Sequence, residues 1–417
     1  MTAETYHNIC DYLAALLKDS VWDGHVYAVG GCCRDEVMGR EINDVDLAVN
    51  LCNGGIGLAR WLFENGYTVA PPVEFERYGT AMLRLAKYPE HEVEIVQTRC
   101  GKYTAENAQT PGCVFGTVED DAMRRDFTVN SLYYDISAKR LLDVTGYGLD
   151  DIKNRRLRTP MPPESTFFDD PVRILRCIRL VSEWGWKIDK EIIAGAQKNL
   201  GGLKDIKPER RRGEFEKMLC GADPVRAMKL MRSIGAMTSI IPELTRTYKR
   251  KVCHGNGETL WNCALQSLRN VCDAGGGLHM RVAALLQVIG AMPELYGMCD
   301  THDLSLRGIR LAEACEHMLR RLHYHQGFLK EVLFMLRNRY AMARWGNSAE
   351  HCKDRTLKSF VRLCVNRQRL AHMLVFIDCI NNAASADGGD MSGQIPAVRE
   401  KLKNIVKNKN RRNGCNN

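Results

Sequence analysis

The spacing of apolar and polar positions divides the chain near residue 150. Before it, four runs alternate or end in turn residues, as strands do: 25–31, 44–50, 80–86 and 92–98. Helical stretches accompany them at 33–39 and 57–66. After it, apolar residues recur at helical spacing in 170–185, 208–221, 223–235, 260–271 and 329–345, and several of these stretches open on Asp-Pro or Pro-Glu and close on Gly. The pattern predicts an α/β head followed by an all-helical remainder.

Length and composition limit the class of protein. A chain of 417 residues suggests about two to four domains. Its 45% hydrophobic and 26% charged residues are typical of soluble globular proteins. The longest apolar runs, such as 280–292, contain charge or are too short to cross a membrane, and the N-terminal stretch carries acids where a signal peptide would be basic. We therefore expect a cytoplasmic protein that does not associate with membranes.

Cysteine usage and charge add less. The 17 cysteines are irregularly spaced and include no CxxC, so neither a disulfide framework nor a zinc ribbon is indicated. The net charge of +9 is compatible with a polyanionic partner. The tail 401–417 has six Lys or Arg and no acid, which suits either a solvated end or an RNA-binding arm.

A glycine turn and a carboxylate pair carry the first chemical signal. Gly30 and Gly31 follow a predicted strand and open a helix, so backbone N–H groups can approach an anion there. The stretch matches neither a dinucleotide fingerprint nor a P-loop. Ten residues after Arg34, Asp44 and Asp46 lie on one side of a strand, where they repel each other unless a cation is bound. The combination predicts a site for a triphosphate bound through two Mg²⁺ ions.

Glu94 is a third candidate acid, on a separate strand. It alternates with Val93 and Ile95, so it is either a metal ligand or a solvent-facing charge.

Five motifs in order resemble one known family. They are 30–47, which contains the glycine turn and the acid pair, then 124–132, 141–160, 169–180 and 209–219. Together they cover roughly residues 25–245 and resemble the nucleotidyltransferase head of the eubacterial-type family of CCA-adding enzymes and bacterial poly(A) polymerases. The resemblance implies a template-free polymerase that extends the 3′ end of an RNA with Mg²⁺. It also implies a nucleotidyltransferase head at 1–145, a nucleotide-reading neck at 146–245 and a helical body and tail at 246–417.

The resemblance also assigns roles in the head. Asp44 and Asp46 match the acids that bind the catalytic metals, with Glu94 as a further candidate ligand. Gly31 and Arg34 match positions that contact phosphate, and Arg125 matches a nucleotide-contacting position. Asp126 and Asn130 lie four apart, on one face if the segment is helical, and are suited to grip ribose hydroxyls. Helix capping is the alternative role for Asp126.

The stretch 169–180 carries the predicted base selection. Asp170 and Arg173 are one turn apart and can present an acceptor beside a donor, which matches cytosine and adenine but leaves polar groups unpaired with uracil or guanine. The alternative is a helix cap at Asp170 followed by a basic stripe of Arg173, Arg176 and Arg179. By resemblance, Arg176 and Arg179 are also nucleotide-binding. Asp169 departs from the Glu found in many CCA-adding members.

Two further helical segments are expected to lack catalytic residues. We expect the helix with Glu209, Arg210 and Glu214 to support the base-reading helix. In many bacterial relatives a His-Asp phosphohydrolase module follows, but here Gln287 and Val288 replace its ligands. His302-Asp303 lies beyond that helix and is interpreted as a loop pair. The module is therefore predicted to bind tRNA without phosphohydrolase chemistry.

The sequence favours addition of C, C and A to the 3′ end of tRNA from CTP and ATP, by a monomer or a homodimer. The segment 100–122 is long enough for a loop that switches from C to A addition. A poly(A) polymerase or a partial (CC- or A-) adding enzyme is the alternative. A non-catalytic RNA-binding paralogue is disfavoured, because it would not need the acids and arginines together.

Overall fold

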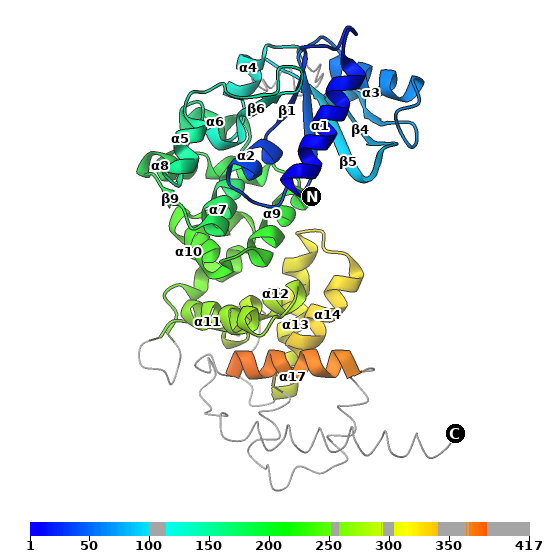
Figure 1. Ribbon diagram of the computed structural model, residues 1–417. Coiled ribbons are helices and arrows are strands. Elements are labelled where there is room, and N and C mark those ends of the chain that lie inside the picture. The colour runs from blue at the N-terminus through cyan, green and yellow to red at the C-terminus, as the bar shows by residue number, and fades with distance from the viewer. Residues whose placement is uncertain are drawn as a thin grey trace, which may run out of the picture. The chain divides into compact units, whose positions relative to one another are not determined.

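A seven-stranded mixed sheet organises the N-terminal part of the chain (Figure 1). The order is β3-β4-β5-β2-β1-β6-β7, in which β2 pairs parallel to β5 and the other neighbours pair antiparallel. The strands are β1 (Val26–Val29), β2 (Val45–Val49), β3 (Val73–Phe75), β4 (Thr80–Leu85), β5 (Tyr88–Gln97), β6 (Leu132–Asp135) and β7 (Arg140–Asp143). The four predicted strands are confirmed as β1, β2, β4 and β5. β6 was not predicted because all four of its residues are buried, which removes the alternation.

The computed structural model describes residues 1–100, 114–251, 258–292, 294, 304–340, 364 and 367–381. They divide into two units. The first comprises Met1–Arg173 and Trp186–Asn199, and the second comprises Ile174–Gly185 and the described residues from Leu200 onward. The boundaries predicted at 145 and 245 remain a prediction.

The two faces of the sheet carry different helices. α1 (Ala3–Leu17), α2 (Gly31–Val37) and α3 (Gly54–Glu64) share a hydrophobic cluster with the odd-numbered residues of β2. The opposite face packs Ala48 and Tyr133 against α4 (Val118–Met123). Because side chains alternate along a strand, Asp46 lies on the α4 face, with its neighbours Val45 and Leu47 buried on the other.

The rest of the first unit adds short helices. They are the 3₁₀ turn η2 (Thr128–Asn130), α5 (Gly148–Lys153), α6 (Pro163–Asp169) and α8 (Lys190–Lys198), with a two-stranded parallel sheet of β8 (Arg156–Leu157) and β9 (Lys187–Ile188). α7 (Val172–Trp184) begins in this unit and continues into the second.

The second unit is helical throughout its described part. Its longer helices are α9 (Pro208–Cys220), α10 (Pro224–Ile234), α11 (Leu260–Asp273), α12 (Leu278–Leu286), α13 (Leu304–Arg320), α14 (Gln326–Asn338) and α17 (Arg367–Asn381). The predicted order of an α/β head followed by helices is thus confirmed. Across the described ranges, no helix combines the length and apolarity that a membrane span requires.

Candidate active site

Two carboxylates stand side by side on the α4 face of the sheet. The parallel pairing of β2 with β5 sets Asp46 opposite Glu94. Asp44, which is exposed, lies just before the first residue of β2. Burial, followed by repulsion from Glu94, raises the pKa of Asp46 to about 6, with Arg125 opposing the shift and Asp44 adding to it. The acids predicted from separate parts of the sequence therefore share one electrostatic site.

Gly30 brings the end of β1 against this site. Its φ of +77° and ψ of −121° belong to a region that is almost restricted to glycine. A Cβ at this position would lie 3.2 Å from Arg125 Nη1 and 3.9 Å from Asp46 Oδ2. A Cβ on Gly31 would lie 3.8 Å from Arg34 Nη2. The glycine pair therefore lets two arginines and a carboxylate approach the backbone closely, an arrangement that suits binding of a phosphate chain.

A chain of hydrogen bonds joins Arg34 to the residues predicted to contact ribose. Arg34 Nη1 donates to Asn130 Oδ1 at 2.6 Å, and Asn130 Nδ2 donates to Asp126 Oδ1 at 2.9 Å. Arg34 is held in turn by both oxygens of Asp35, at 2.8 and 2.7 Å. The segment forms no α-helix, because Asn130 ends the single 3₁₀ turn η2, but the two side chains are nevertheless in contact. Asp126 also accepts a bond from the N–H of Phe127 at 2.9 Å.

Asp170 and Arg173, which are predicted to read the base, lie close to this hydrogen-bonded chain. Arg173 Nη2 donates to the carbonyl of Arg124 at 2.6 Å, and Arg173 Nη1 donates to the carbonyl of Thr166 at 3.2 Å. Burial lowers the pKa of Arg173, whereas the charges of Asp126 and Asp170 act in the opposite direction. Asp170 Oδ1 accepts a bond from the N–H of Val172 at 3.2 Å, so the predicted cap is present as well.

Arg176 and Arg179 follow at three-residue intervals on α7 and belong to the second unit. Arg179 Nε donates to Glu214 Oε2 of α9 at 2.8 Å, and its Nη1 lies 3.5 Å from Glu183 Oε2. Glu214 is buried. This ion pair ties α9 to α7, in agreement with the supporting role expected for α9.

The carboxylates fit a divalent metal. Asp46 is a half-buried acid beside the exposed Glu94, and hard oxygen donors suit Mg²⁺. Within the described ranges, however, no group of three or more His, Cys, Asp or Glu is placed to hold a metal by itself. Asp44 and Asp46 would hold Mg²⁺ together with oxygens of the bound nucleotide.

Asp121, which is fully buried in α4, was not predicted to belong to the site. Its carboxylate accepts bonds from Arg124 and Arg125 and from the Tyr133 hydroxyl. The sequence contained a signal for this contact. An acid that stands three and four residues before two arginines can form an ion pair with each of them across one helical turn.

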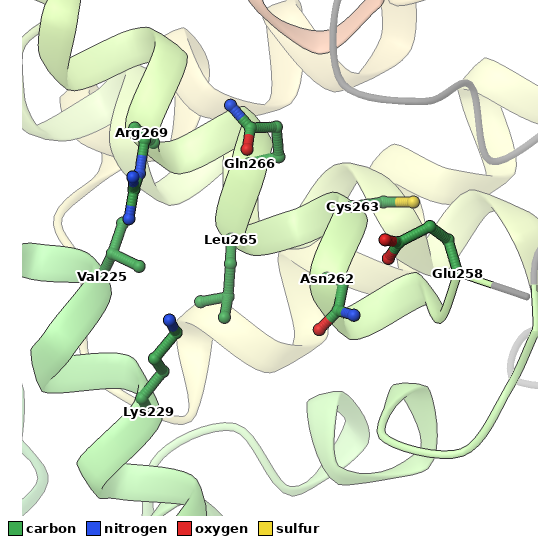
Figure 2. Close-up of a pocket in the computed structure, with 8 residues that line it drawn as sticks. All are labelled: Val225, Lys229, Glu258, Asn262, Cys263, Leu265, Gln266 and Arg269. Carbon is green, nitrogen blue, oxygen red and sulfur yellow. The ribbon is translucent and has the colours of Figure 1, made fainter.

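A separate pocket of about 390 Å³ lies in the second unit (Figure 2). Val225 and Lys229 of α10 line one side. Its other lining residues are Glu258, Asn262, Cys263, Leu265, Gln266 and Arg269. None of them is a predicted site residue, so the candidate site is identified by its side chains and not by this cavity.

The place expected for phosphohydrolase ligands is part of the helical core. Gln287 and Val288 are buried, and Gln287 Nε2 donates to Ser267 Oγ at 3.2 Å. His302-Asp303, most of the loop predicted at 100–122 and the basic tail 401–417 lie outside the described residues.

Parts of the chain match known protein families and curated proteins. Residues 26–158 match the family model of the poly(A) polymerase head domain, and residues 185–247 match that of a probable RNA- and SrmB-binding site of polymerase A. A mitochondrial CCA tRNA nucleotidyltransferase of Saccharomyces cerevisiae is 37% identical over 220 residues, which cover 49% of this chain and 40% of the relative. Poly(A) polymerase I of Escherichia coli is 29% identical over 225 residues, covering 53% and 48%.

The fold of the chain also matches solved structures. The structure of a CCA-adding enzyme in its apo form I superposes with a TM-score of 0.64 at 20% identity and covers 97% of this chain and 83% of that one. At that identity the likeness concerns the fold alone. The chain spans less than half the length of the two curated relatives described above.

Proposed function

We propose that the chain is a member of the family of CCA-adding tRNA nucleotidyltransferases and bacterial poly(A) polymerases, and that it adds C, C and A to the 3′ end of tRNA from CTP and ATP. The observation that carries the proposal is the convergence at Gly30. A Cβ on Gly30 would lie 3.2 Å from Arg125 Nη1 and 3.9 Å from Asp46 Oδ2, so both groups approach the same point of the backbone. An acid for a metal and a cation for phosphates thus lie close together at this glycine.

The first step is binding of the nucleotide. Arg34 and Arg125 would contact the triphosphate, because a guanidinium donates charge-assisted bonds to phosphate oxygens. Asn130 and Asp126 would contact the ribose hydroxyls. Asp44 and Asp46 would hold Mg²⁺, which when bound lowers the pKa of the primer 3′-hydroxyl and neutralises charge on the leaving pyrophosphate.

The second step is choice of the base. Asp170 supplies an acceptor and Arg173 a donor, a pattern that pairs with the amine and ring nitrogen of cytosine or adenine. Support comes from Arg173 being anchored to the carbonyls of Arg124 and Thr166, which leaves little freedom for its guanidinium. A fixed donor rejects uracil and guanine, since each would place an N–H against it.

Sequencing of reaction products tests the proposal. The protein is incubated with Mg²⁺ and a tRNA that ends at the discriminator base, with CTP and ATP supplied singly and together. We expect three added nucleotides, C, C and A, and none from the Asp46→Asn variant. Long A tracts would identify a poly(A) polymerase, and CC or A alone a partial adding enzyme. Binding of tRNA without any addition by the wild type would overturn nucleotidyl transfer itself.

For the helical unit we propose tRNA binding without phosphohydrolase chemistry. The support is that Gln287 and Val288, where ligands were expected, are buried in its core. A 2′,3′-cyclic phosphodiesterase assay with Ni²⁺ or Mg²⁺ checks this, and activity that is lost in His302→Ala would contradict it. A cytoplasmic location is likewise our proposal, to be checked by cell fractionation because the yeast relative is named as mitochondrial.

A further inference from the structure

The buried carboxylate of Asp121 accepts hydrogen bonds from three side chains and from one backbone N–H. Its Oδ1 accepts bonds from Arg124 Nε at 2.9 Å, from Arg124 Nη2 at 2.6 Å and from the N–H of Arg99 at 3.2 Å. Its Oδ2 accepts bonds from Arg125 Nε at 3.1 Å, from Arg125 Nη2 at 2.9 Å and from the Tyr133 hydroxyl at 2.7 Å. Each carboxylate oxygen therefore holds one arginine.

The two arginines contact different parts of the candidate site. Arg125 has its Nη1 within 3.2 Å of the position that a Cβ on Gly30 would take, on the side of the acids. Arg124 offers its carbonyl to Arg173 Nη2 at 2.6 Å, on the side of base selection. A shift of Asp121 would therefore change the position of Arg125 and the contact between Arg124 and Arg173, although Asp121 itself is not expected to touch the nucleotide.

The charge of Asp121 is preserved despite its burial. Burial alone would raise its pKa, but Arg125 and Arg124 outweigh that effect and hold the pKa of the carboxyl well below its usual range. The carboxylate is thus ionised at neutral pH, as an anchor for two guanidinium groups must be.

We propose that Asp121 is a positioning residue that fixes Arg125 and the Arg124–Arg173 contact together, so that triphosphate binding and base choice depend on one buried carboxylate. This inference rests on the proposed function. A positioning role differs from a purely structural one, in which Asp121 would stabilise the fold without affecting nucleotide binding or base selection by the folded protein.

The variant Asp121→Asn separates the two roles. Asparagine has nearly the same shape, but its amide presents N–H groups where one of the carboxylate oxygens was, so one arginine loses its acceptor. The matched control is Asp120→Asn on the same helix. Asp120 is exposed and caps α4 by accepting a bond from the N–H of Thr117 at 3.0 Å, and it holds no arginine in the described structure. Its loss would weaken the helix without moving Arg124 or Arg125.

Both variants are first shown to be folded by circular dichroism at the assay temperature. The KM for CTP, kcat, and the ratio of kcat/KM for CTP over UTP are then measured on the same tRNA. We expect Asp121→Asn to raise the KM roughly tenfold or more and to lower the CTP/UTP ratio by a similar factor, and Asp120→Asn to change neither by more than about twofold. A folded Asp121→Asn with unchanged KM and unchanged ratio overturns the inference.

A second variant, Tyr133→Phe, tests the inference if Asp121→Asn does not fold. Tyr133→Phe removes one donor to Asp121 Oδ2 and one acceptor of Arg125 Nε, at 2.7 and 3.0 Å, and keeps the carboxylate and both arginines. It should raise the KM by a smaller factor, about two- to fivefold, and a KM equal to that of the wild type would contradict the inference. Calorimetric binding of Mg²⁺-CTP to the wild type is measured in parallel. Wild type that binds CTP but transfers nothing refutes the proposed function, whereas active wild type with unaffected variants refutes only the role of Asp121.

Discussion

Replacement of Arg173 by Ala is the most direct test of base selection by side chains. Arg173 is half-buried, and its guanidinium donates to two backbone carbonyls, those of Arg124 and Thr166. Truncation to Ala removes the donor that cytosine and adenine require and the group that would oppose the ring N–H of uracil. The variant should therefore lose affinity for the correct bases and lose discrimination against the wrong one.

The magnitude follows from the cost of an unpaired buried polar group, about 1–3 kcal/mol. Since about 1.4 kcal/mol corresponds to a factor of ten, the preference for CTP over UTP should fall roughly 5- to 150-fold. The lost bonds to the two carbonyls should also lower the free energy of unfolding by about 1–3 kcal/mol. Stability and selectivity must therefore be measured on the same preparation.

The assay is single-nucleotide incorporation into a tRNA that ends at the discriminator base, with CTP and UTP in separate reactions. Arg156→Ala is the control, because Arg156 forms a partly exposed ion pair with Asp189 at 2.6 Å in the same unit and is outside the site. Such pairs contribute about 0–1 kcal/mol. Its nucleotide preference should match that of the wild type. If Arg173→Ala keeps the full preference for CTP over UTP, side-chain reading of the base by this residue is refuted.

Three further predictions concern the remainder of the site. Gly30→Ala should lower kcat/KM at least tenfold and lower the free energy of unfolding by about 1–3 kcal/mol, because its Cβ would crowd Arg125. Gly39 also has a positive φ, but nothing lies within 4 Å of where its Cβ would be, so Gly39→Ala should lose stability alone. Equal kinetics of the two variants would refute the contact with Arg125. Asn130→Ala should increase use of dCTP relative to CTP, because a ribose contact is lost, and an unchanged ratio in a primer-extension assay would exclude that role. Asp46→Asn should abolish nucleotidyl transfer. In the absence of metal its melting temperature should be no lower than that of the wild type, because the substitution removes a charge that burial and Glu94 disfavour. A large drop in the melting temperature would contradict this.

Much of the fold could be predicted from local patterns. Alternation identified β1, β2, β4 and β5, and helical spacing with Asp-Pro and Gly boundaries identified α7, α9 and α10. Elements without a local signature were missed. β6 is buried along its whole length, so it shows no alternation. The residues around Asp126 and Asn130 suggested a helix by their spacing, but a single 3₁₀ turn already brings the two side chains into contact.

The sequence by itself predicted the chemistry, because the candidate reactive groups lie in short motifs. The pair Asp44 and Asp46, the glycine turn, and the one-turn spacing of Asp170 and Arg173 need only backbone geometry to predict what they can bind. The tertiary structure alone decided which distant residues meet. Parallel pairing of β2 with β5 sets Glu94 beside Asp46. The packing of α4 on the sheet buries Asp121 where it forms ion pairs with Arg124 and Arg125. Such contacts depend on strand register and on burial, which bring together residues that no local spacing relates.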